Sequence, residues 1–211
     1  VVYGDGDDWG RWADGGGSSL ELADPSSDNR LSMNWQGSDE SRKSAGRWTS
    51  IAETCVLEGG NGAADELHVF LMGAGECQVD DVVVRKAGAS AQLRESFEAG
   101  ANGWQFWGNH VRSSHEQGGG HPGEGSLHVR ASGPGDMTGG NSKGEDGNPT
   151  FDRVTRPIGS GLAQGDTVTI ECRARWVQGS PLLVLGLKGL WMEASGLLDV
   201  PPDLGTPGAP N

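Results

Sequence analysis

The residues best suited to chemistry in this sequence form a short run of aromatic and amide side chains, Trp104-Gln105-Phe106-Trp107-Gly108-Asn109. In an extended strand alternate residues share a face, which puts Trp107 beside Gln105 and Asn109. An indole ring matches the flat C–H face of a sugar, while neighbouring amides bind its hydroxyl groups. We therefore predict that Trp107 is a sugar platform. Its predicted polar partners are Gln105, Asn109 and Arg112.

The other tryptophans receive different predictions. Trp191 follows a Gly-Leu pair that interrupts its strand pattern, and we add it to the candidate ligand-binding residues. Trp176 lies on the apolar side of an alternating run and is predicted to belong to the core, as is usual for tryptophan. Trp48 is predicted to be structural. The same average burial leaves an alternative open for Trp107, namely that it packs under a loop.

No pattern in the sequence predicts an active site. His115-Glu116 is followed by His121, but the helix of a zinc protease needs its second histidine four residues after the first. The acidic runs that begin at Asp5 and Asp24 have glycine and tryptophan where an EF-hand requires a glutamate at its twelfth position. The nucleophile elbow, the phosphate-binding loop and the dinucleotide fingerprint are also absent from the sequence. We therefore predict no catalytic residues and no enzyme activity.

The composition indicates a chain that is rich in turns, and it argues against nucleic-acid binding and membrane insertion. The sequence has 37 glycines and 10 prolines among 211 residues, and 34% of its residues are apolar. The net charge of −13 repels phosphate backbones and anionic lipids, so we exclude nucleic acid as a partner. No run approaches the roughly 20 apolar residues of a membrane span, which predicts no membrane insertion by this segment.

Period-two alternation predicts several strands. Between Thr167 and Val177, apolar residues alternate with threonine, glutamate and arginine, which is typical of a half-buried antiparallel strand. Shorter alternating rows occur at 67–71, 127–131 and 183–187. Because no comparable window keeps a helical period, we predict an all-β fold with little helix, an antiparallel β-sandwich.

The three cysteines, Cys55, Cys77 and Cys172, fit no metal-ligand spacing. A disulfide between Cys55 and Cys77 agrees with the sequence as well as two buried thiols do.

The first 38 residues contain spaced landmarks, Tyr3-Gly4-Asp5, Asp14-Gly15-Gly16-Gly17, Asp24-Pro25 and Asn34-Trp35. These landmarks resemble the closing strands of a bacterial lamin-tail domain. The resemblance implies that residues 1–38 are the end of a small immunoglobulin-like β-module. Because such modules occur in large secreted or surface proteins, we expect an extracellular or cell-surface segment of a longer chain, with its export signal upstream.

A second set of motifs follows. The segment 75–84 combines paired aspartates with alternating aliphatic residues, and Phe97-Glu98, Gly103-Trp104 and 125–129 come after it. These motifs resemble the closing and opening strands of the jelly-roll, galactose-binding-like sandwiches of carbohydrate-binding modules. The resemblance implies two units. They are residues 39–88, with a closing strand at 77–85, and residues 89–200, before a Pro/Gly linker at 201–211.

The paired aspartates suggest a role for a cation. Asp80 and Asp81 point to opposite faces of their strand, so one of them shares a face with valines and needs a partner. The resemblance implies a structural calcium ion at Asp80, Asp81 and Glu98, the one cofactor that we expect. The second unit lacks a paired-aspartate strand, which separates it from the family pattern. Hydrogen bonding to a turn or pairing with an arginine is the alternative for these carboxylates.

These observations together predict a non-catalytic extracellular binding module. Its predicted partners are a polysaccharide or a cell-surface glycan and the flanking domains of the same chain. Two alternatives stay open. One is a structural or adhesive spacer module without a ligand, and the other is an accessory domain of a glycoside hydrolase.

Overall fold

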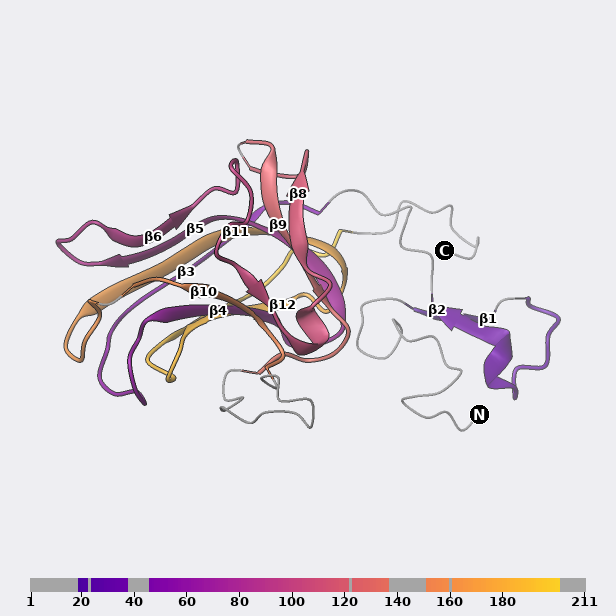
Figure 1. The fold of residues 1–211 in the computed structure, drawn as a ribbon. Coiled ribbons are helices and arrows are strands. Elements are labelled where there is room, and N and C mark those ends of the chain that lie inside the picture. Colours follow the sequence, from indigo (N-terminus) through magenta and orange to yellow (C-terminus); the bar gives the residue numbers. More distant parts are fainter. Residues whose placement is uncertain are drawn as a thin grey trace.

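The computed structural model describes residues 19–22, 24–37, 46–121, 123–136, 151–159 and 161–201. These residues contain no α-helix, and nearly all of their regular structure is strand (Figure 1). The elements in chain order are β1 (Leu20–Leu22), η2 (Ser32–Asn34), β2 (Trp35–Gly37), β3 (Thr49–Val56), β4 (Glu66–Leu71), β5 (Gly75–Lys86), β6 (Ala91–Glu95), β7 (Gln105–Phe106), η4 (Gly108–His110), β8 (Ser114–Gln117), β9 (Gly125–Ala131), β10 (Val154–Pro157), β11 (Thr167–Gly179), β12 (Leu182–Leu187) and β13 (Glu193–Leu197).

Within residues 46–201 the strands form two antiparallel sheets that stack as a sandwich. One sheet has five strands in the order β13-β12-β4-β10-β7. The other has six, with the order β3-β11-β5-β9-β8 and with β6 pairing along the second half of β5. Figure 1 shows these strands as two curved layers. The prediction of an all-β antiparallel sandwich with little helix is confirmed.

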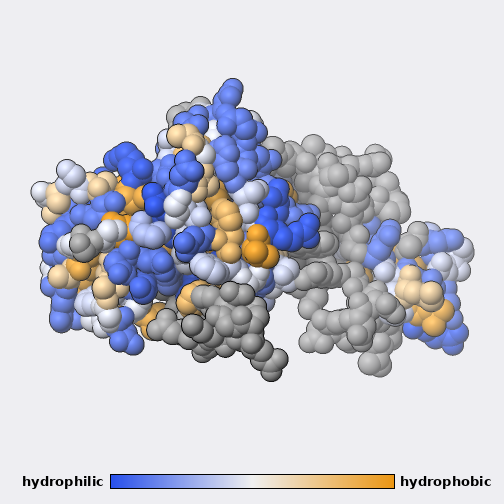
Figure 2. Space-filling view, viewed as in Figure 1, coloured by the Kyte–Doolittle hydropathy of each residue, from blue (hydrophilic) through white to orange (hydrophobic). Residues whose placement is uncertain are grey.

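The core between the sheets follows from the alternation in the sequence. In β11 the residues from Val168 to Trp176 are buried at every second position, and the residues between them are half-buried. Leu127 of β9 and Leu185 of β12 are fully buried. Burial of one such aliphatic side chain contributes about 1.5–3 kcal/mol. The surface in Figure 2 is mainly hydrophilic, with separate smaller hydrophobic areas.

The structure corrects the predicted division into two sandwich units. β3, β4 and β5 belong to the first predicted unit, yet each pairs with strands of the second. β11, for example, lies between β3 and β5 along most of its length. The first segment contributes only three strands, and the eight strands of the second are separated in each sheet by β5 or β4 of the first, so the core closes only when the strands of both segments interleave. The predicted boundary between the two units, at residues 88 and 89, lies in the turn that joins β5 to β6, where Gly88 has a φ of +74°.

β1 and β2 form a two-stranded antiparallel ribbon, in which Leu22 lies opposite Trp35. The indole N–H of Trp35 donates a hydrogen bond to the carbonyl oxygen of Asn29 at 3.1 Å. The lamin-tail landmarks before Ser19, and the predicted linker after Pro201, lie outside the described residues.

All three cysteines are free thiols, so the alternative of a Cys55–Cys77 disulfide is not formed in this structure. Cys77 and Cys172 are buried, and Cys55 is half-buried. Among the described residues no helix has the length and apolar character needed to cross a membrane.

Candidate functional site

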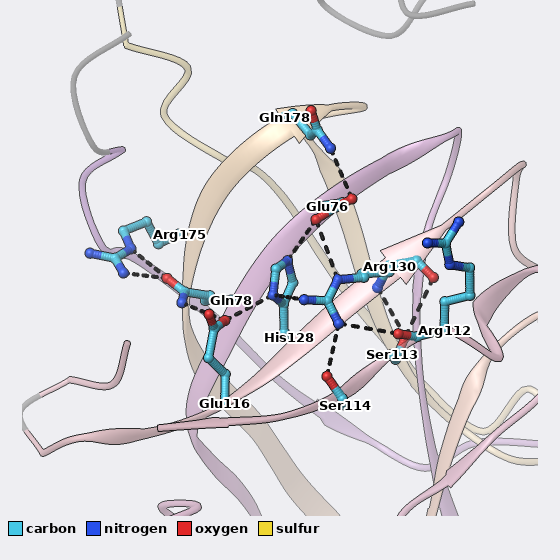
Figure 3. Close-up of polar contacts among 10 residues, drawn as sticks. All are labelled: Glu76, Gln78, Arg112, Ser113, Ser114, Glu116, His128, Arg130, Arg175 and Gln178. Carbon is cyan, nitrogen blue, oxygen red and sulfur yellow. Dashed lines mark hydrogen bonds and ion pairs between the residues drawn. The ribbon is translucent and has the colours of Figure 1, made fainter. Parts of the chain in front are cut away.

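The outer face of the six-stranded sheet carries a cluster of polar side chains, called the polar face below (Figure 3). Cys77, Leu127 and Trp176 on its strands are buried in the core. Alternation therefore directs their neighbours to the opposite side of the sheet. The residues of the polar face are Glu76, Gln78, Arg112, Ser113, Ser114, Glu116, His128, Arg130, Arg175 and Gln178.

The register of the sheet aligns four of these residues in one row across four strands. Gln78 of β5 lies opposite Arg175 of β11 on one side and opposite His128 of β9 on the other. Ser114 of β8 lies opposite His128 in turn. Because directly opposite residues in an antiparallel pair are neighbours on one face, the row is a direct result of strand pairing.

Hydrogen bonds connect the row from side to side. Arg175 donates from Nε to Gln78 Oε1 at 2.8 Å, and Gln78 donates from Nε2 to Glu116 Oε2 at 3.0 Å. The same Glu116 oxygen lies 2.8 Å from Nδ1 of His128. Gln78 and Glu116 are thus each held by contacts with their neighbours.

Glu76 contacts His128 and Gln178 of the polar face. Its Oε2 lies 2.8 Å from Nε2 of His128, at an angle that is oblique for a hydrogen bond, and its Oε1 accepts a hydrogen bond from Gln178 Nε2 at 2.8 Å. His128 is the largest influence that lowers the pKa of Glu76, with help from Gln178 and Arg130 and against the effect of burial. Glu76 is therefore held as a carboxylate.

Arg130 lies beside His128 and is fully engaged. Its Nη1 donates to Ser114 Oγ at 2.8 Å and to the carbonyl oxygen of Arg112 at 3.2 Å, and its Nη2 lies 2.8 Å from His128 Nδ1. The His128 side chain is only 8% exposed, whereas that of Glu116 is 39% exposed. The polar face thus has a buried centre and an accessible rim.

An aromatic ring lies at the edge of this face. The guanidinium carbon of Arg175 is 5.0 Å from the centre of the Trp48 ring, within the range of a cation–π contact. The ring of His121 lies 5.5 Å from Trp48 on another side. Trp48 was predicted to be structural, and the structure brings it next to the hydrogen-bonded row.

The β8–β9 connection packs directly over the row. The carbonyl oxygen of Gly119 accepts a hydrogen bond from Arg175 Nη2 at 3.3 Å. A Cβ atom at Gly119 would lie only 2.1 Å from Gln78 Nε2. The absence of a side chain at Gly119 therefore permits the position that Gln78 takes.

The predicted platform, Trp107, lies on the other sheet. Its indole N–H donates to Thr155 Oγ1 at 3.1 Å, and its ring meets the edge of Phe151 at a centroid distance of 6.1 Å. Gln105 lies opposite Thr155, so Gln105 and Trp107 both adjoin Thr155. The strand ends at Phe106, so Asn109 lies in the 3-10 turn η4 and not in the extended strand that the alternation assumed.

The remaining predicted ligand-binding residues are dispersed. Asn109 donates from its side-chain amide to the carbonyl oxygen of Pro134 at 2.8 Å. Arg112 belongs to the polar face, where its guanidinium lies apart from the row (Figure 3). Trp191 packs against Gly60 and donates its indole N–H to the carbonyl oxygen of Gly62 at 3.1 Å. The structure therefore does not gather Arg112 and Trp191 around Trp107.

The predicted calcium ligands lie near the junction of β5, β6 and β9. Asp80 is 1% exposed and accepts main-chain N–H hydrogen bonds from Asp81 at 2.7 Å and from His121 at 2.6 Å. Burial raises the pKa of Asp80, and the nearby charges of Asp81 and Glu98 act in the same direction. Glu98 accepts the N–H of Gly125 at 3.1 Å. Among the described residues no group of three or more histidine, cysteine, aspartate or glutamate side chains has the geometry of a metal site.

Sequence reasoning missed the polar face because its members come from four separate strands. One signal was available, since Glu76 and Gln78, like His128 and Arg130, alternate with core residues. That signal marks them as outward-facing, but it does not say which strands are neighbours. Comparison with known proteins adds no further identification, because no family model, curated protein or solved structure matches the chain.

Proposed function

We propose that the sandwich is a non-catalytic extracellular module that binds a polysaccharide on its polar face. The observation that carries this proposal is a series of contacts across adjacent strands, from Arg175 through Gln78 and Glu116 to His128, beside the Trp48 ring. The first two contacts are hydrogen bonds, and the third is an ion-pair contact. Rigid strands keep donors and acceptors in place, which lowers the entropic cost of binding.

The chemistry of the row suits a neutral sugar. Sugar hydroxyls both donate and accept, and the row offers amide, carboxylate and guanidinium groups at short intervals. The polar face combines Arg112, Arg130 and Arg175 with Glu76 and Glu116, so its positive and negative charges nearly balance. An aromatic ring at the edge supplies the apolar surface that sugar C–H groups require.

Affinity electrophoresis against a set of soluble polysaccharides tests the proposal. We expect retardation of the wild-type chain that is lost in Trp48→Ala and kept in Trp107→Ala, with both variants retaining the wild-type circular dichroism spectrum. Loss in Trp107→Ala alone would move the ligand to the surface predicted from the sequence. If no polysaccharide retards the wild-type chain, the result would instead favour a spacer module without a ligand.

Calcium remains a proposal for Asp80, Asp81 and Glu98, as a structural ion at the strand junction. The three side chains supply the hard oxygen atoms that calcium prefers. If calcium binds there, millimolar calcium raises the melting temperature relative to EDTA, and Asp81→Asn removes that increase. Equal melting temperatures with calcium and with EDTA would refute the calcium site.

A further inference from the structure

One nitrogen atom at the centre of the polar face has two partners that it cannot satisfy together. Nδ1 of His128 lies 2.8 Å from Glu116 Oε2 and also 2.8 Å from Arg130 Nη2. An arginine only donates hydrogen bonds, and a carboxylate only accepts them. Nδ1 must therefore be unprotonated to bond Arg130 and protonated to bond Glu116.

The other ring nitrogen has a constant environment. Nε2 is buried and lies 2.8 Å from Glu76 Oε2. Although the angle is oblique for a hydrogen bond, the negative charge of Glu76 attracts a proton on Nε2 in both charge states of the ring. A change in the charge of His128 therefore takes place at Nδ1, where the two competing partners meet.

We propose that protonation of His128 changes the hydrogen-bond partner of its Nδ1 from Arg130 to Glu116. This change determines whether Glu116 is held in one position on the polar face. In the imidazolium form Nδ1 donates to Glu116, and the row from Arg175 to His128 is continuous. In the neutral form Nδ1 accepts from Arg130, and its lone pair repels Glu116. Glu116 then keeps only its hydrogen bond from Gln78.

The charged groups around the ring come from each neighbouring strand. Glu76 is supplied by β5, Glu116 by β8 and Arg130 by β9, while Arg175 of β11 acts through Gln78. Two carboxylates and two arginines therefore surround the ring. The exchange of the Nδ1 partner needs no movement of the backbone, because each of these groups belongs to a strand that is paired in the sheet.

The consequence for binding rests on the proposed function. A continuous row presents Glu116 in one position, so the ligand does not have to order it. We expect polysaccharide affinity to be highest where His128 is charged and to fall about fivefold as the ring loses its proton, the effect of one well-placed hydrogen-bonding group.

Long-range ¹H–¹⁵N NMR of the histidine rings in the ligand-free protein tests the exchange directly. The expected result is two protonated nitrogens on His128 at the acidic end of the imidazole range, about pH 5 to 8. At the alkaline end we expect the Nε2–H form, with Nδ1 accepting a hydrogen bond. Glu116→Gln removes the negative partner and should shift the titration to lower pH. An Nδ1–H form at high pH, or a titration that Glu116→Gln leaves unchanged, would overturn the proposal.

A binding measurement separates this proposal from the proposed function. Affinity electrophoresis over the same pH range should show the loss of affinity in the wild type and a flat response in His128→Gln, whose amide does not titrate. The same pH response in both proteins would refute the link to binding. Absence of binding at every pH would contradict the proposed function, while the NMR result would still decide the partner exchange.

Discussion

Acid should destabilise the sandwich through His110, a fully buried histidine in η4. Its Nε2 accepts the main-chain N–H of Leu71 at 3.1 Å, and its Nδ1 is bonded to the side-chain oxygen of Asn109. Because Nε2 must keep its lone pair, this arrangement requires a neutral ring. Burial lowers the pKa of His110 to about 4, and the charge of Asp152 offsets only part of this effect.

The size and sign of the effect follow from linkage. In the unfolded chain His110 has its ordinary pKa of 6.5, so below that pH the unfolded state binds a proton that the folded state refuses until about pH 4. The free energy of unfolding therefore falls as the pH drops from 6.5 to about 4. At about 1.36 kcal/mol for each pH unit, the loss from His110 alone is about 3 kcal/mol.

Urea unfolding between pH 7.5 and pH 4 measures this loss. His110→Gln is the matched variant, since its amide oxygen can accept the N–H of Leu71 and does not titrate. We expect the wild type to lose about 3 kcal/mol more than the variant over this range. Asp80, with its raised pKa, acts in the opposite direction as the pH falls, but it does so in both proteins. Parallel stability curves for the two proteins would refute the reasoning.

Two further predictions concern a pair of glycines and the thiols. Gly108 and Gly62 both have positive φ, +53° and +83°, but a Cβ at Gly108 would lie 2.2 Å from a main-chain oxygen, whereas one at Gly62 would meet nothing within 4 Å. We expect Gly62→Ala to cost about 1–2 kcal/mol from the backbone alone and Gly108→Ala about 2–5 kcal/mol, measured by thermal unfolding. Equal losses of stability in the two variants would contradict the steric argument, because they would show that the structure accommodates a Cβ at Gly108 at no extra cost. Burial raises the pKa of Cys77 and brings that of Cys172 to about 12, while Cys55 is only partly buried. Titration of the native protein with a thiol reagent should therefore modify Cys55 alone, and rapid modification of all three would contradict the packing.

Much of the local structure could be predicted from the sequence. The alternation from Thr167 to Val177 lies within β11, and the apolar row at 67–71 belongs to β4. The alternation around Trp107 was correct only as far as Phe106, where the strand ends, and Asn109 lies in the 3-10 turn η4. The predictions for β4 and β11 succeed because strand alternation is a property of the backbone and of nearest neighbours along the chain.

The candidate site could not be predicted from alternation alone. The alternation in β5 and β9 marks Gln78 and His128 as outward-facing, but their meeting depends on pairing between strands about 50 residues apart in the chain. The position of Trp48 beside Arg175 depends likewise on contacts between distant segments.

The sequence by itself determined that this chain forms antiparallel strands and, as in β9 and β11, which residues of a strand enter the core. The tertiary structure alone decided that the strands of residues 46–201 share one sandwich, because β4 and β5 of the first predicted unit lie between strands of the second in the two sheets. It also decided that Arg175, Gln78 and His128 lie in one row. Register between distant strands depends on closure of the common core, and no short stretch of sequence contains that information.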